Sequence, residues 1–205
     1  MIDFSVQALR VLRASVVASV LVLFAAPGFA APVAAAADPF GQADAGYAKR
    51  FQAGENDKMI AMLDEALKAD PKAYGALWRR ARTEKFKGDR AEQPKKIEIY
   101  TRAKELAEQA VAADPSRWEG HYWLGVSLGK WGVANGILKS LSMAKPMRNE
   151  LEKAIELNPG VPGPHYALAI LYRMVPGMIS IGDKKKGLQH AQAAVDLDAN
   201  DTGYQ

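Results

Sequence analysis

Large aromatic residues recur along the chain in company with cationic residues. Trp78, Tyr122 and Tyr166 follow one another at intervals of 44 residues. Four cationic residues come soon after these aromatic residues: Arg82, Lys85, Lys130 and Arg173. An aromatic ring offers a large contact area at low entropic cost, and a nearby cation pairs with a carboxylate. Such a set is suited to an extended peptide or an acidic ligand. The same rings are equally suited to packing between structural units, and the sequence leaves both interpretations open.

Two histidines also recur at the 44-residue interval. His121 and His165 would form a metal-binding pair only if their side chains converged. The chain has no cysteine, no H-E-x-x-H motif and no acidic partner for these histidines at ligand spacing. We therefore expect the histidines to pack at unit interfaces, and we predict no metal site and no cofactor.

Catalytic motifs are not evident. The segment Gly125–Trp131 is only faintly similar to a phosphate-binding loop, because it has three residues between its glycines and lacks Ser or Thr after Lys130. No spacing of Ser, His and Asp indicates a nucleophile elbow. We therefore expect no catalytic residue and no enzymatic activity.

The elements that must position these side chains are helices in a repeated arrangement. The phrases A-L-K-A-D-P, A-V-A-A-D-P, A-I-E-L-N-P and A-V-D-L-D-A end at Pro71, Pro115, Pro159 and Ala199. Before each phrase, apolar residues recur at helical spacing, and proline then ends the helix. The regular recurrence predicts a repeat array, and the absence of strand-like alternation predicts an all-α fold.

The units resemble tetratricopeptide repeats (TPRs), which are helix-turn-helix units with small residues at fixed positions. Counting back from each closing residue places small side chains at the eighth, twentieth and twenty-seventh positions, where two helices must approach closely. These residues are Ala81, Gly125, Ala169, Ala103, Gly187, Ala66, Ala110, Ala154 and Ala194. The resemblance implies an α-solenoid of about four units, at 42–73, 74–117, 118–161 and 162–201.

Units two and three are ten residues longer than the usual TPR, and we place the extra residues between the two helices. In unit three the insert is 133–145, and Met147 replaces the small residue at position twenty. We expect Gly54, Gly88 and Gly132 to form the turns between paired helices. The central part is similar to the TPR-like domain of the regulator-of-microtubule-dynamics family and to exported bacterial proteins that accompany transporter components.

The TPR resemblance implies a concave groove lined by positions two, five, nine, twelve and thirteen of each first helix. The aromatic and cationic residues fall on these positions, which gives the following predicted groove: Trp78, Arg82, Lys85, Tyr122, Lys130, Tyr166 and Arg173. A protein or peptide partner is the first hypothesis. A small-ligand carrier or transport accessory, with the inserts closing the groove into a pocket, is the alternative. The net charge of +4 is too small to indicate a nucleic-acid partner.

The N-terminus resembles a secretory signal peptide. Arg10 and Arg13 precede an apolar run, Ala14–Ala26, and small residues follow it. We expect residues 1–30 to be removed, with cleavage after Ala30 or after Ala37, and residues 31–41 to form a flexible leader. An apolar run this short does not reach across a bilayer. The sequence thus predicts a periplasmic or secreted protein without a stable membrane span after cleavage.

At the other end, the last repeat has no visible polar capping element. A solenoid needs such a cap to keep its terminal unit soluble. We therefore expect either a longer chain or a final helix that is covered by a partner or by a second copy of the protein. The second case would make the protein a homo-oligomer.

Overall fold

The computed structural model describes residues 40–177 and 180–200, with the side chains of residues 199 and 200 excepted. The predicted signal peptide and nearly all of the predicted leader lie outside these ranges. The described residues form helices and no strand. The helices are α2 (Gly41–Ala48), α3 (Glu55–Ala69), α4 (Tyr74–Arg90), α5 (Lys95–Ala113), α6 (Trp118–Ala134), α7 (Ile137–Leu157), α8 (Pro162–Met174) and α9 (Lys184–Asn200).

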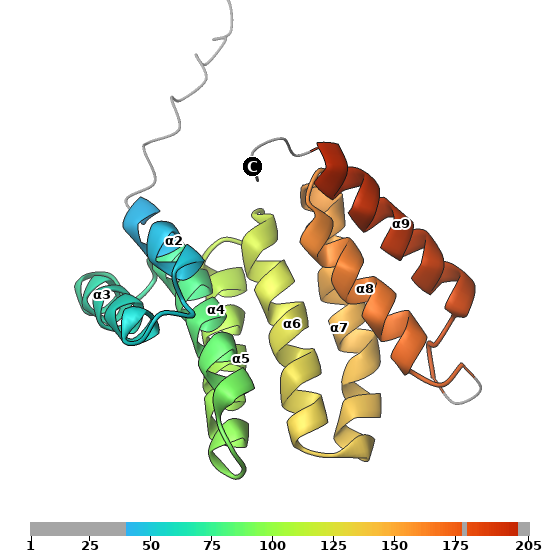
Figure 1. Ribbon diagram of the computed structural model, residues 1–205, viewed down its shortest axis with the longest axis horizontal. Coiled ribbons are helices and arrows are strands. Elements are labelled where there is room, and N and C mark those ends of the chain that lie inside the picture. The colour runs from blue at the N-terminus through green and yellow to red at the C-terminus, as the bar shows by residue number, and fades with distance from the viewer. Residues whose placement is uncertain (1–39, 178–179, 201–205) are drawn as a thin grey trace, which may run out of the picture. The chain divides into compact units, whose positions relative to one another are not determined.

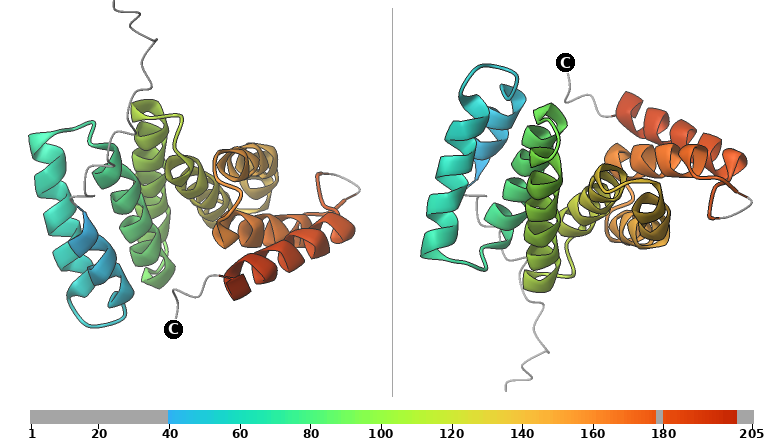
Figure 2. Two further views of the ribbon diagram at one scale, coloured as in Figure 1. Left: turned by 90° about the horizontal axis from the view of Figure 1, so that it is seen from above. Right: turned by 90° about the horizontal axis from the view of Figure 1, so that it is seen from below.

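Consecutive helices pair as hairpins, and the hairpins stack in chain order. The pairs α4/α5, α6/α7 and α8/α9 follow one another, with α6 next to both α4 and α8 (Figures 1 and 2). This is the predicted all-α array of TPR-like units. Each unit buries one face against the next, so the core is continuous along the array.

The recurring Asp-Pro or Asn-Pro dipeptide ends a helix in the same way three times. Asp70, Asp114 and Asn158 each leave the helical region for an extended backbone conformation. Each side chain then accepts a hydrogen bond from the backbone N–H two residues later, at 2.9, 3.0 and 3.1 Å. The proline between donor and acceptor blocks continuation of the helix. The repeated sequence phrase therefore encodes a repeated local structure.

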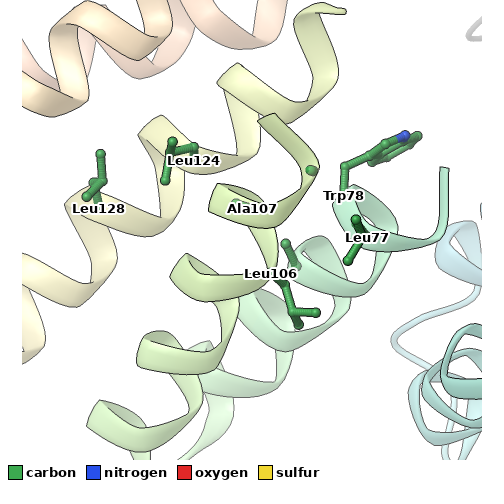
Figure 3. Close-up of a cluster of buried hydrophobic side chains, with 8 residues drawn as sticks. Leu77, Trp78, Leu106, Ala107, Leu124 and Leu128 are labelled. Carbon is green, nitrogen blue, oxygen red and sulfur yellow. The ribbon is translucent and has the colours of Figure 1, made fainter. Parts of the chain in front are cut away.

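The central core lies where α4, α5 and α6 meet. Leu77 and Trp78 of α4, Leu106 of α5 and Leu124 of α6 are all less than 8% exposed, and they belong to one cluster (Figure 3). Small residues at the predicted positions let these helices approach closely. Examples are Ala81, Ala103, Ala110 and Ala154, each with 0% exposure.

The inserts of units two and three are helical, which corrects the prediction of extra residues between the helices. In unit three the turn is only Asn135 and Gly136, and most of the segment 133–145 extends α6 and α7. The reason is local: Leu141, Ala144, Met147 and Leu151 recur at intervals of three or four residues, so the segment continues the apolar periodicity of α7. The added length makes the two hairpins longer without adding a long loop.

The prediction of a turn is wrong at two of the three glycines, Gly88 and Gly132. Gly54 adopts a left-handed conformation (φ 78°) at the start of α3, as a turn glycine should. Gly88 and Gly132 are helical and buried instead. Unit three turns at Gly136 (φ 95°), outside the position that the TPR register indicates.

Glycines of α6 mark close contact with α7. A Cβ atom added to Gly129 would lie 2.7 Å from the sulfur of Met147. One added to Gly132 would lie 3.1 Å from the Cα atom of Ser140. The absence of a side chain at Gly132, next to backbone atoms, therefore sets the spacing of the unit-three hairpin.

Candidate partner-binding groove

Helices α6 and α8 present the same repeat positions to a common cavity. Positions five, nine and thirteen contribute Tyr122, Val126 and Lys130 from α6. The corresponding residues of α8 are Tyr166, Ile170 and Met174. These spacings of four residues place each set on one side of its helix. The cavity has a volume of about 530 Å³, and we call it the open groove.

Helix α7 and one residue of α4 complete the walls of the open groove. From α7 come Ser140, Met143, Ala144 and Met147, together with Val133 at the end of α6. Lys85 of α4 lies at one end. The extended part of unit three therefore contributes a wall that an ordinary TPR would lack.

Several apolar side chains of the open groove face solvent. The exposed fractions are 63% for Tyr166, 71% for Met174, 64% for Val133 and 38% for Ile170. Tyr122 lies deeper, and burial raises the pKa of its phenol to about 12. Neighbouring exposed apolar side chains on a protein surface are typical of an interaction site.

The cations at the edge of the open groove share one carboxylate. Asp89 receives hydrogen bonds of 2.7 Å from Lys130 and Tyr100 and lies 2.7 Å from Lys85. Partial burial opposes ionisation of Asp89, but these contacts outweigh it and lower the pKa of the carboxyl to about 2. Asp89 therefore positions the predicted site residues Lys85 and Lys130, and the three side chains together carry a net positive charge at this edge of the open groove.

The equivalent face of unit two is covered, which corrects the prediction of an accessible ring and cation there. Trp78 is 7% exposed and Arg82 is 8% exposed. The guanidinium of Arg82 lies 4.0 Å from the ring centre of Tyr47 and 2.7 Å from Asp44, both on α2. Arg79 bonds the same Asp44 carboxylate at 2.6 Å and lies 4.1 Å from the Trp78 ring centre. We call the side of α4 that α2 contacts, formed by Arg79, Arg82 and Phe86, the covered face.

Electrostatics and aromatic contacts both hold α2 on the covered face. Partial burial raises the pKa of Asp44, but Arg79 and Arg82 outweigh that effect, so its net pKa is lowered. Near the C-terminal end of α4, Arg90 lies 3.5 Å from the ring centre of Phe86, and Phe86 packs edge-on against Tyr47 of α2. A guanidinium over an aromatic face is favourable and more so where water is excluded.

Arg173, the last predicted site residue, is exposed on α8 but does not line the open groove. The structure therefore brings four predicted residues to one cavity: Lys85, Tyr122, Lys130 and Tyr166. The apolar positions nine and thirteen of α8 and the wall from α7 were absent from the predicted site. Ile170 and Met174 occupy positions that the TPR resemblance assigns to the groove, so the signal was present for them.

The two predicted histidines do not converge. His121 lies 2.7 Å from Glu150 through Nδ1 and 3.0 Å from the carbonyl oxygen of Pro115 through Nε2. His165 instead approaches His190 of α9. The two rings thus contact residues of different helices, α7 and α9, which the repeat register could not show.

A buried ion network of unit two also escaped prediction. Arg80 and Glu84 are each 3% exposed and lie 2.5 Å apart, and Arg80 also contacts Asp64 of α3 at 2.7 Å. Paired burial keeps each charge compensated. This network links α3 to α4 and carries no feature of a catalytic centre.

Comparisons with solved structures agree on the fold. TTC0263, described as a thermophilic TPR protein in Thermus thermophilus, is 20% identical with a TM-score of 0.61, over 79% of this chain and 74% of that one. MamA 41-end from Desulfovibrio magneticus RS-1 is 19% identical with a TM-score of 0.51, over 78% and 75%. At such identities the likeness shows a TPR-like fold and nothing more.

Sequence relatives decide the family. The family described as Regulator of microtubule dynamics protein 1-3 matches residues 40–184. The chain belongs to this family. Regulator of microtubule dynamics protein 1 from Bos taurus is 30% identical over 112 residues, which are 53% of this chain and 34% of that protein. The Mus musculus protein of the same name is 28% identical over a similar stretch. The chain therefore spans about a third of the length of these curated relatives.

Across residues 40–177 and 180–200, no helix combines the length and the apolar character that crossing a bilayer requires.

Proposed function

We propose that this member of the regulator-of-microtubule-dynamics family is an exported, non-catalytic scaffold that binds an apolar segment of a protein partner in the open groove. One observation carries the proposal: Tyr122 and Tyr166, at the same position of successive units, line one apolar cavity. Aromatic anchors in a concave apolar site supply most of the binding energy in many interfaces.

The proposal places the partner's apolar side chains between α6 and α8. Exposed Tyr166, Ile170 and Met174 give contact area on one side, and Val126 and Tyr122 do so on the other. Methionine adapts its shape to different apolar partners. The cationic edge at Lys85 and Lys130 suits a partner with a carboxylate next to its apolar residues.

Export rests on the charged, apolar and small-residue pattern of the first 30 residues. The role named for the relatives belongs to proteins of which the matched stretch is 34%, so we do not extend it to this chain. An exported scaffold would instead meet partners in the periplasm or outside the cell.

A small apolar ligand is the second candidate, and a specific observation favours it. Val133, Ser140 and Met143 of the extended hairpin form a third wall of the cavity. A volume of about 530 Å³ lies in the range of small-molecule sites, which is about 300–1,000 Å³. In this case the protein would be a carrier or a transport accessory.

The test selects phage-displayed 12-residue peptides on the mature chain and measures their binding to matched variants. Ile170→Asp places a charge in the open groove, whereas Leu188→Asp places one on an exposed apolar position of α9. We expect peptides with apolar and aromatic residues to bind the wild type and Leu188→Asp, and to bind Ile170→Asp at least about tenfold more weakly.

Equal binding to both variants would overturn the groove as the peptide site. Native mass spectrometry of the tag-free protein from its own source then tests the second candidate. A bound mass below about 1 kDa that Ile170→Asp loses and Leu188→Asp keeps would favour the carrier over the scaffold.

A further inference from the structure

We infer that His165 and His190 form a binding site for a divalent transition-metal ion in the last helix pair. His165 lies in the first turn of α8 and His190 in the middle of α9, and these helices lie side by side (Figure 1). Their Nδ1 atoms are 3.0 Å apart and their ring centres 5.2 Å apart. Two imidazole nitrogens from different helices thus point at one another.

The separation of the two nitrogens matches the bite of a metal ion. An ion bound to both at about 2.05 Å would have an N–metal–N angle of about 94°. Tetragonal Cu²⁺ and Ni²⁺ place neighbouring ligands at about 90°, and imidazole is a favoured ligand for both. Tetrahedral Zn²⁺ would need the nitrogens about 3.3 Å apart. Affinity for imidazole ligands rises from Ni²⁺ to Cu²⁺ and falls again at Zn²⁺, so Cu²⁺ is expected to bind most tightly.

Contacts around His190 hold its ring in place. The ring stacks on Tyr172, with centres 5.7 Å apart and planes inclined by 12°. Tyr172 is 3% exposed and donates a hydrogen bond of 3.3 Å to Glu152 of α7. A ligand whose ring is oriented by its neighbours loses less entropy when a metal binds.

The rest of the coordination sphere is left to water. Within the described ranges, no group of three or more His, Cys, Asp and Glu residues could hold a metal ion. His165 and His190 are both half-buried, so solvent reaches the space beside them. Two protein ligands with bound water are compatible with four or more ligands around Cu²⁺ or Ni²⁺.

Metal binding at this site needs no net loss of protons from two neutral imidazoles. In the hydrogen-bonded pair, one Nδ1 donates its proton to the other. A ring that binds metal through Nδ1 carries its proton on Nε2 instead. The donor ring therefore changes tautomer, and both Nδ1 lone pairs become available.

The bound ion would fasten α9 to α8. His165 directly precedes Tyr166, and the same helix carries Ile170, so the fastened helix is one wall of the open groove. A metal ion that binds only the folded protein stabilises it by mass action. At a concentration about 100 times the Kd, we expect the Tm to rise by about 5–11 °C.

The experiment titrates the tag-free mature chain with NiCl₂ and CuCl₂ by calorimetry, with MgCl₂ as the control ion. We expect one site per chain for Ni²⁺ and Cu²⁺ and none for Mg²⁺. His165→Ala and His190→Ala should each weaken binding at least about tenfold, because one imidazole cannot chelate. His121→Gln is the matched control and should keep wild-type affinity, because His121 contacts Glu150 and not the pair.

Two further measurements separate metal binding from folding. His165→Gln and His190→Gln retain polar side chains in case the alanine variants unfold, and far-UV circular dichroism checks each variant. The electron paramagnetic resonance spectrum of the Cu²⁺ complex should show two imidazole nitrogens in the wild type and fewer in each variant. No binding to the wild type, or wild-type binding in a variant that carries both His165→Gln and His190→Gln, would overturn the site.

Discussion

Position five of the repeat is aromatic in units two, three and four, yet the three rings have different surroundings. Trp78 is 7% exposed in the core between α4, α5 and α6, with Arg79 over its ring, whereas Tyr166 is 63% exposed in the open groove. The same repeat position therefore serves stability at one end of the array and remains accessible at the other. The difference comes from the side chains that surround each ring and not from the repeat position itself.

The covered face binds acidic and aromatic side chains of α2. Helix α2 supplies a carboxylate, Asp44, to two guanidiniums and an aromatic ring, Tyr47, to Arg82 and Phe86. The open groove offers apolar side chains with a cationic edge. Helix α2 is therefore an example, within the chain, of a segment whose aromatic and acidic residues bind this side of the array.

The largest expected effect comes from truncating the covered ring. Trp78→Ala should lower the free energy of unfolding by about 3–5 kcal/mol, because it removes a large buried side chain and leaves a cavity. Tyr166→Ala should change it by less than about 0.5 kcal/mol, because most of that ring is exposed. Urea denaturation of both variants measures the contrast. Similar losses for the two would abolish the distinction between the covered face and the open groove.

A smaller effect is expected from the carboxylate that holds α2. Asp44→Asn removes the negative charge that the buried Arg79 and Arg82 both contact, so the free energy of unfolding should fall by about 1–2 kcal/mol. Trp78 should become more accessible to water, which red-shifts its fluorescence. Glu105→Gln, at an exposed position of α5, is the matched control. An unchanged stability in Asp44→Asn would mean that α2 is held by its aromatic contacts alone.

Acid should weaken both regions through different carboxylates. Asp44 and Asp89 have lowered pKa values in the folded chain, to about 2 for Asp89. The unfolded chain therefore binds more protons below about pH 4, and the free energy of unfolding falls as the pH drops towards 2. After screening by solvent, we expect about 1 kcal/mol from each carboxylate.

Denaturant titrations from pH 6 to pH 2 separate the two contributions. Asp44→Asn should flatten the pH dependence that comes from the covered face, and Asp89→Asn the part that comes from the edge of the open groove. Curves that stay parallel to the wild type for both variants would assign acid sensitivity to other carboxylates.

The smallest effect is expected at Arg173, which is exposed and lies outside the open groove. Arg173→Ala should change the free energy of unfolding by less than about 0.5 kcal/mol. It should also leave peptide binding unchanged, unlike Ile170→Asp. Surface plasmon resonance with a selected peptide checks the second point. A clear loss of binding would extend the groove to the cationic face of α8.

Much of the fold could be predicted from the sequence because its signals are local. Each Asp-Pro or Asn-Pro closes a helix with atoms only two residues apart, and helical spacing of apolar residues is visible in any short window. Helix α5, for example, ends at Ala113, just before the Asp114-Pro115 dipeptide that predicts its end. The insert of unit three is mistaken for a linker when its length is compared with the usual repeat and not with its own periodicity.

The candidate site was less accessible to such reasoning because it depends on distant contacts. Asp44 and Arg82 are 38 residues apart, and His165 and His190 are 25 apart. Nothing in the repeat register shows that α2 contacts Arg82 or that α9 presents a histidine to α8. These contacts come from the packing of helices, which a pattern within one helix does not encode.

The glycines of α6 differ in what sequence change they allow. Beside Gly132 lies the backbone of Ser140, which has little freedom to move, so an added methyl group would push the hairpin apart. Beside Gly129 lies the flexible thioether of Met147, and both residues line the open groove. An alanine at Gly129 would redirect Met147 and reshape the groove while the helices keep their places. During evolution, one methyl group at this position would change the shape of the open groove without rebuilding the repeat.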